Sequence, residues 1–264
     1  MTEAHKRRVA GVFGRAAADY DRVGPPVFGP IAERLVDLAG VGEGMAVLDV
    51  ACGAGAVLET ALRRTGPEGR VVGIDLSPEM VAEAGRRVPA AEVREMDAER
   101  LDFAGERFDR VLCASALFLL PDPEAALVGF RRVLRPGGVV GISSWSPDDS
   151  RWLSWSGLLT DLGIAFEPLM TRSASDSAAV ESLVSRAGFE DASVAIERDA
   201  LEFDDERDWW TWLWTQGQRA TLERLDPRTL SSLEAEATAR VAALRGDDGR
   251  LSMPIDVTYA TARR

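Results

Sequence analysis

The segment DVACGAG (residues 49–55) combines residue types that suit the binding of a small charged molecule. Gly53 and Gly55 can adopt positive φ values and allow the backbone to approach a ligand closely. If a helix follows, its first N–H groups attract an anion. Asp49 would repel a pyrophosphate, whereas it would pair with an ammonium group. We therefore expect the turn to bind a zwitterion, with its carboxylate at the N–H groups and its ammonium group at Asp49.

A dinucleotide-binding turn is the alternative interpretation. Its fingerprint, G-x-G-x-x-G, requires a third glycine where this sequence has Leu58. Asp75 lies 20 residues after Gly55 and suits the binding of ribose hydroxyls under either interpretation. The missing glycine and the acid at position 49 disfavour a nicotinamide-dependent oxidoreductase, which stays open as a less favoured function.

Short apolar runs alternate with helical segments between residues 41 and 145. This alternation predicts a parallel sheet wound by right-handed crossovers. Two later segments, 192–203 and 254–264, alternate apolar and polar residues and are expected to pair at one sheet edge. We predict a doubly wound, Rossmann-like α/β fold with a seven-stranded, mostly parallel sheet and an antiparallel C-terminal edge strand. The expected strands of the parallel part are 45–51, 70–76, 91–97, 108–116 and 139–145.

Five segments, in order, carry a family resemblance: VLDVACGAG, GIDLSPEM, MDAERLDF, FDRVLCASALFLLPDP and VLRPGG. Together they resemble the class I S-adenosylmethionine-dependent methyltransferases. The branch that they resemble most contains ubiquinone/menaquinone C-methylases and small-molecule methyltransferases of bacterial secondary metabolism. The resemblance covers roughly residues 10–145, and it implies S-adenosylmethionine as cofactor, S-adenosylhomocysteine as product and no metal.

The resemblance also implies roles for single residues. Asp49, Gly53 and Gly55 would hold the methionine end of the cofactor. Asp75 would accept hydrogen bonds from the ribose hydroxyls, and Asp97 would accept one from the adenine amino group. The other expected cofactor contacts are Tyr20, Ala51, Leu76, Met80, Ala98 and Ser115.

The regions that flank the five segments indicate how the chain is divided. Amphipathic helices near 6–18 and 26–39 are extra to the winding of the sheet, so residues 1–40 are predicted to form an N-terminal helical lid. Residues 41–264 then form the Rossmann-like methyltransferase domain. Helical insertions around 146–180 and 205–246 would supply the site for the methyl acceptor.

Methyl transfer from a sulfonium needs a nucleophile placed in line with the sulfur, and a hydroxyl acceptor also needs a base. The sequence offers three weak candidates for that base. His5 is the only histidine and lies near the N-terminus, where an exposed side chain is the simpler interpretation. Asp148 and Asp149 follow the fifth expected strand, where they equally suit a solvated turn. The catalytic residue is therefore left open.

Aromatic residues after position 117 indicate where the acceptor binds. In the expected helix 206–214, the tryptophans and Leu213 cover an arc of roughly 200° at about 100° per residue. This arc predicts a helix buried on two sides, although core packing alone would also explain it. An aromatic-lined cavity favours a flat or apolar acceptor. The expected pocket residues are Phe118, Trp145, Trp152, Trp155, Trp210 and Trp214.

Composition limits the remaining function classes. The formal net charge is −12, which disfavours binding to nucleic acid or to an anionic membrane surface. The two cysteines provide no disulfide framework, and the N-terminus lacks a signal peptide, so we expect a cytoplasmic protein. The predicted enzyme is a monomer or homodimer that methylates a small aromatic or polyketide-like metabolite, with oxygen favoured over carbon or nitrogen. A cofactor-binding fold that catalyses a reaction other than methylation is the other alternative.

Overall fold

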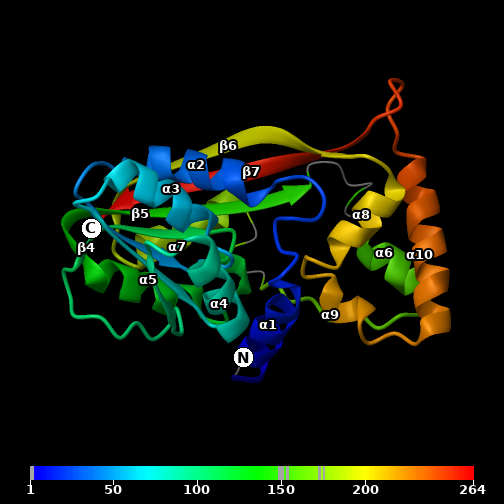
Figure 1. The fold of residues 1–264 in the computed structure, drawn as a ribbon, viewed down its shortest axis with the longest axis horizontal. Helices are drawn as coiled ribbons and strands as arrows, with labels where there is room; N and C mark the ends of the chain where they lie inside the picture. Colours follow the sequence, from blue (N-terminus) through cyan, green and yellow to red (C-terminus); the bar gives the residue numbers. More distant parts are fainter. Residues whose placement is uncertain (1–2, 148–151, 153–154, 172–173, 175) are drawn as a thin grey trace.

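The computed structural model describes residues 3–147, 152, 155–171, 174 and 176–264. Seven strands form one sheet in the order β3-β2-β1-β4-β5-β7-β6, which confirms the predicted seven-stranded, mostly parallel architecture (Figure 1). The strands are β1 (Ala46–Val50), β2 (Arg70–Asp75), β3 (Glu92–Glu95), β4 (Phe108–Ala114), β5 (Leu134–Pro147), β6 (Glu190–Phe203) and β7 (Leu251–Arg263).

The C-terminal strand β7 is antiparallel, as predicted, but it lies second from the edge because β6 pairs with its outer side. β7 alternates buried and partly buried residues along most of its length, as an inner strand does. β6 is more exposed and carries consecutive charged residues at 197–199, a feature that protects edge strands against further pairing. The charge pattern therefore distinguishes the two strands.

Helices cover both faces of the sheet. α2 (Phe28–Leu38), α3 (Ala56–Thr65) and α4 (Pro78–Arg87) share one buried apolar cluster, and α5 (Pro123–Val133) and α7 (Ser177–Arg186) contribute to another on the opposite face (Figure 1). All five residues of β1 are buried, as expected for a parallel strand covered on both sides. α2 packs beside α3 and against β4 and β5, so only α1 (Glu3–Ala16) of the proposed lid lies away from the sheet face.

A second group of helices lies beyond the far ends of β6 and β7, and we call it the cap (Figure 1). The cap consists of α6 (Trp155–Asp161), α8 (Glu206–Leu213), α9 (Arg219–Leu222) and α10 (Pro227–Ala242). A short 3₁₀ turn, η1 (Leu117–Leu119), follows β4. None of the described helices combines the length and the apolarity needed to cross a lipid bilayer.

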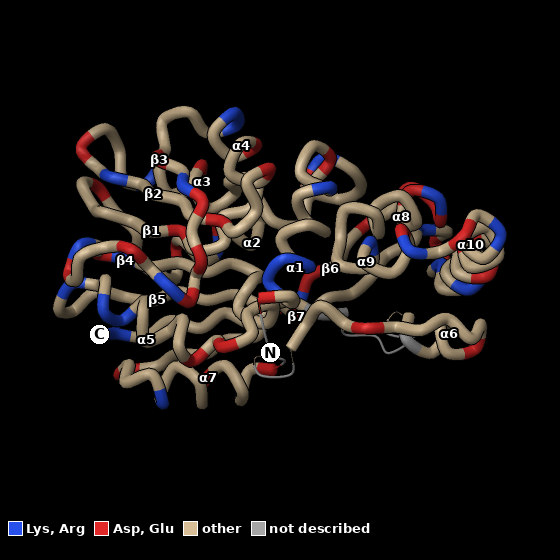
Figure 2. The backbone as a smooth tube through the Cα atoms, turned by 90° about the horizontal axis from the view of Figure 1, so that it is seen from below, with Lys and Arg blue, Asp and Glu red and all other residues tan. Residues whose placement is uncertain are grey.

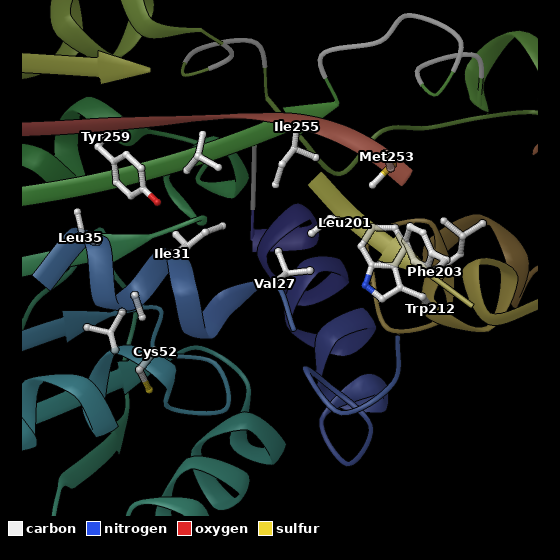
Figure 3. Close-up of a cluster of buried hydrophobic side chains, with 14 of the residues drawn as sticks. Val27, Ile31, Leu35, Cys52, Leu201, Phe203, Trp212, Met253, Ile255 and Tyr259 are labelled. Atoms are coloured by element: carbon white, nitrogen blue, oxygen red, sulfur yellow. The ribbon is translucent and has the colours of Figure 1, made fainter. Parts of the chain in front are cut away.

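One apolar cluster joins the sheet to the cap. Ile31 and Leu35 of α2 belong to it, as do Phe203 at the end of β6, Trp212 of α8 and Met253 of β7 (Figure 3). The long β6–β7 pair thus carries the cap at a fixed position relative to the strand ends where a ligand would bind.

The start of α8 depends on one capping side chain. Asp205 Oδ1 accepts hydrogen bonds from the main-chain N–H groups of Arg207 and Asp208, each at 2.8 Å. Replacing Asp205 with alanine leaves these two donors without that acceptor, and we expect the free energy of unfolding to fall by about 1 kcal/mol. Urea denaturation would measure the change. Asp204→Ala, at the exposed neighbour outside the helix, is the control, and an equal loss in both variants would contradict the capping role.

Candidate functional site

A cavity of about 410 Å³ opens at the carboxyl ends of the parallel strands. Ala51 after β1, Asp75 at the end of β2, Asp97 after β3 and Ser115 after β4 all line it. In a doubly wound sheet, ligands bind at this edge, because the strand ends and the helix N-termini meet there. α1 and the cap complete the wall, so the cavity has a polar end at the sheet and an aromatic end in the cap.

The glycine turn between β1 and α3 has the backbone that a ligand cradle requires. Ala51, Gly53 and Gly55 have φ values of 57°, 51° and 96°, in the left-handed region. A Cβ at Gly55 would lie only 3.0 Å from Val88 Cγ2, so glycine is also needed there for packing against the end of α4. At Gly53 a Cβ would lie 3.7 Å from the ring of Tyr20, which covers the turn from outside.

Asp75 holds the glycine turn and faces the cavity. Its Oδ2 accepts a hydrogen bond from Gly53 N and its Oδ1 accepts one from Ser77 N, both at 2.9 Å. Burial raises the pKa of Asp75, and these main-chain hydrogen bonds partly oppose the rise. Because a carboxylate has about four lone-pair sites, Asp75 can still accept a hydrogen bond from a ligand beside these main-chain donors.

Two side chains beside the turn have polar atoms without partners among the described residues. Asp49 is 1% exposed, and its Oδ2 accepts no hydrogen bond there. Burial, reinforced by the charge of Asp75, raises the pKa of Asp49 well above its ordinary value. Ser115 has a φ of 53° and a buried Oγ that is likewise unpaired. A cationic ligand that also donates hydrogen bonds would satisfy this arrangement.

α1 is tied to the cavity by Lys6, the only lysine in the chain. Its Nζ lies 2.7 Å from Asp97 Oδ2 and 2.5 Å from Glu99 Oε2. Burial by itself would lower the pKa of Lys6, but the hydrogen bonds to the two carboxylates raise it above its ordinary value. Asp97 Oδ1 accepts a further hydrogen bond from Glu99 N at 2.9 Å. The ion pairs thus position Asp97 and close α1 over the polar end.

Tryptophans from the cap and from β5 form the aromatic end. Trp145 lies 6.1 Å from Trp212, and Trp152 lies 6.3 Å from Trp209, measured between ring centroids. All four line the cavity, together with Trp155 and Phe118. Phe118, Trp145, Trp152 and Trp155 are among the pocket residues expected from the sequence, whereas Trp209 and Trp212 are not.

Trp210 and Trp214, which the sequence analysis assigned to this pocket, do not line it. At about 100° per residue, Trp209 and Trp212 share one face of α8, whereas Trp210 points to another side. Trp210 packs behind Trp155, with ring centroids 6.5 Å apart. Trp214 follows the last residue of α8 and contacts the guanidinium group of Arg219 instead.

Of the three candidates for a base, only His5 lies among the residues that the structure describes. His5 Nε2 lies 3.1 Å from the main-chain oxygen of Leu119, and His5 is absent from the lining. Asp148 and Asp149 lie outside the described residues. Within the described lining, the ionisable side chains are Lys6, Tyr20, Asp75 and Asp97, and burial raises the pKa of Tyr20 strongly. Among all the residues that the structure describes, no cluster of His, Cys, Asp or Glu could hold a metal ion.

Comparison with known proteins decides the family. Residues 47–138 match the family described as "Methyltransferase domain". The nocamycin O-methyltransferase of Saccharothrix syringae is 32% identical over 274 residues, which cover 96% of this chain and 97% of that protein. The chain belongs to the class I S-adenosylmethionine-dependent methyltransferases. The resemblance seen in the sequence is thereby confirmed.

Two further relatives of this methyltransferase show partial and distant similarity. Aklanonic acid methyltransferase DauC of Streptomyces sp. strain C5 is 35% identical over 146 residues, or 53% of this chain and 66% of that protein. The structure of Haemonchus contortus phosphoethanolamine N-methyltransferase 2 in complex with S-adenosyl-L-methionine superimposes with a TM-score of 0.57 at 18% identity, covering 96% of this chain and 56% of that one. The second comparison shows the shared fold.

The polar end of the methyltransferase's cavity fits the cofactor of its family. The left-handed backbone of the glycine turn leaves room for a close ligand, and the unpaired Asp49 Oδ2 and Ser115 Oγ call for hydrogen-bond donors. Nine of the eleven residues that the sequence analysis assigned to the cofactor line the cavity. Asp49 and Gly55 do not: Asp49 is buried at the end of β1, and Gly55 packs against α4.

Charged residues are mixed over the methyltransferase's surface. Figure 2 shows acidic and basic segments interspersed along α10 and around the sheet, and no basic face dominates the described chain. This distribution agrees with the net charge of −12. The cavity, and not a charged surface, is therefore the candidate binding site.

Proposed function

We propose that this methyltransferase transfers the methyl group of S-adenosylmethionine to an oxygen atom of a flat, polyketide-like small molecule. The observation that carries the proposal is one continuous cavity with carboxylates at its sheet end and tryptophans at its cap end. The name of one relative, nocamycin O-methyltransferase, supports the oxygen atom, and the second name, aklanonic acid methyltransferase, also supports a small-molecule acceptor.

The polar end would hold the cofactor without a metal. Asp49 would pair with its ammonium group, and the glycine turn with the start of α3 would receive its carboxylate. Asp75 would accept from the two ribose hydroxyls through its free lone pairs. Asp97 would accept from the adenine amino group while the ion pair with Lys6 holds the carboxylate in position. Leu76 and Ala98 would flank the adenine ring, since both line this part of the cavity.

When bound, the cofactor supplies a methyl group on a positively charged sulfur, with a neutral thioether as leaving group. The chain's contribution is to bind and orient the two reactants. Trp145 and Trp212 would hold a flat acceptor near the strand ends, and α1, tied by Lys6, would exclude water. Positioning of this kind can give effective molarities of about 10⁵ M in model reactions. An acceptor oxygen that is already ionised, such as a carboxylate or an acidic enol, reacts without a protein base.

The decisive experiment incubates the purified protein with S-adenosylmethionine and a panel of flat phenols, enols and carboxylic acids. Mass spectrometry would follow the gain of one CH₂ unit, and the chemical shift of the new methyl carbon would show which atom carries it. We expect O-methylated product and S-adenosylhomocysteine in equal amounts. A methyl group on carbon or nitrogen would change the acceptor assignment.

Two results would replace the proposal with its alternatives. An acceptor that is transformed while the bound cofactor is never consumed would indicate a non-methylating reaction. Stronger retention of NADH than of S-adenosylhomocysteine would indicate an oxidoreductase. Heat-denatured protein is the control in each case.

A further inference from the structure

A second pocket of about 300 Å³ lies behind the aromatic end of the cavity. Trp152, Trp155 and Trp209 line both spaces, so these three indoles form a shared wall. The rest of the pocket is built by α6 and by α10 with the turn that follows it. Its other lining residues are Leu158, Ala237, Arg240, Val241 and Leu244.

The chemistry of the second pocket is apolar. Arg240, the one charged residue in its described lining, is already paired, with Nε 2.8 Å from Glu236 Oε1 and a terminal nitrogen 3.1 Å from Asp161 Oδ2. The guanidinium is therefore not free to bind an anionic ligand. Protein interiors keep few spaces larger than a water molecule, and apolar cavities bind apolar ligands when they persist. A pocket of this size and lining suits an alkyl chain or a ring.

The shared wall contains one unpaired polar atom. Trp155 is half-buried, and its indole Nε1 is shielded from solvent with no hydrogen-bond partner in the part of the chain that the structure describes. A buried indole N–H normally finds an acceptor. A ligand oxygen placed at the wall would provide that acceptor, and the apolar rings around it would give no competing site.

We propose that the second pocket binds an apolar arm of the methyl acceptor, with a carbonyl oxygen of the acceptor at Trp155 Nε1. The inference rests on the proposed function, because it takes the aromatic end as the acceptor site. The acceptor then has two parts: a flat ring carrying the reacting oxygen in the main cavity, and an arm reaching past the indole wall. The arm would have to displace one indole of the shared wall to enter the second pocket from the main cavity.

The test measures binding and not methyl transfer, so that it stands even if the reaction differs from the proposal. Calorimetry with protein saturated in S-adenosylhomocysteine would compare 4-alkylphenols from methyl to hexyl. We expect affinity to rise about threefold to fourfold with each methylene that enters the pocket. Ala237→Leu fills the pocket and should abolish the rise while leaving the binding of 4-methylphenol unchanged. Ala239→Leu, on the exposed side of α10, is the matched control.

The indole N–H is tested separately. We expect Trp155→Phe to cost 4-hexanoylphenol about fivefold more affinity than 4-hexylphenol, because both ligands lose the same ring contacts but only the ketone also loses one net hydrogen bond. If Ala237→Leu fails to fold, Leu244→Trp blocks the same pocket from its edge. Equal affinities along the alkyl series in the native protein would overturn the proposal, as would an undiminished rise in the filled variants or an absence of phenol binding.

Discussion

Replacing Asp75 with alanine is expected to weaken the binding of both S-adenosylmethionine and S-adenosylhomocysteine by about 10- to 100-fold. The carboxylate faces the cavity and keeps lone-pair capacity for a ligand after it accepts from main-chain N–H groups such as those of Gly53 and Ser77. Alanine would deprive both ribose hydroxyls of a charged acceptor. Both ligands carry the same ribose, so the loss should be similar for the two. Titration calorimetry would measure it.

The main control separates the ribose contact from a distorted turn. Alanine also removes the acceptor of Gly53 N, so the glycine turn could shift and weaken binding by itself. A 2′-deoxy analogue of S-adenosylhomocysteine should bind more weakly than S-adenosylhomocysteine to the native protein. The two ligands should bind to Asp75→Ala with equal affinity. Glu95→Ala removes an exposed carboxylate from the neighbouring strand and should leave both affinities unchanged. Undiminished affinity in Asp75→Ala would refute the ribose assignment.

The polar end of the cavity could be predicted because it depends on local sequence. Asp75, Asp97 and Ser115 each end or follow a strand, and parallel strands bring their carboxyl ends to one edge. Identifying the strands was therefore sufficient to place these residues together. The glycine spacing fixed the turn in the same way, and the positive φ values at Gly53 and Gly55 agree with it.

The aromatic end could be predicted in its composition but not in its geometry. The apolar arc expected for the helix 206–214 is wide enough to include every tryptophan from 209 to 214. Which of them face the cavity depends on how β6 and α10 place the helix, and those contacts come from distant segments. Tertiary packing therefore selected Trp209 and Trp212 over Trp210 and Trp214.

Lys6 shows a different limit. It contacts Asp97, 91 residues away, across a gap that no local pattern describes. The only signal in the sequence is that it is the single lysine in a chain otherwise supplied with arginine. Lysine provides a compact charge, whereas the planar guanidinium of arginine demands more space, and the small buried site between Asp97 and Glu99 fits the former.

The second large effect concerns Asp49 and the pH dependence of cofactor binding. Because burial and the charge of Asp75 raise its pKa well above the ordinary value, Asp49 in the ligand-free protein remains protonated into a higher pH range. Pairing with the ligand's ammonium group requires the ionised form, so S-adenosylhomocysteine should bind more tightly as pH rises toward the raised pKa of Asp49, with release of a proton. The ligand's own α-amino group is that of a free amino acid, so it stays protonated at neutral and acidic pH.

Asp49→Asn is expected to remove both the pH dependence and the released proton, and to weaken binding near pH 7 by about tenfold or more through loss of the ion pair. Calorimetry in two buffers of different ionisation enthalpy would count the proton, with Glu95→Gln as the control.

Stability gives an independent readout. The folded ligand-free protein binds more protons at Asp49 than the unfolded chain does, so its free energy of unfolding should fall as pH rises from about 4 through the raised pKa. In Asp49→Asn this fall should flatten. Two results would show that Asp49 does not meet the ammonium group: a native protein that releases no proton on binding, or a variant whose binding has an unchanged pH profile.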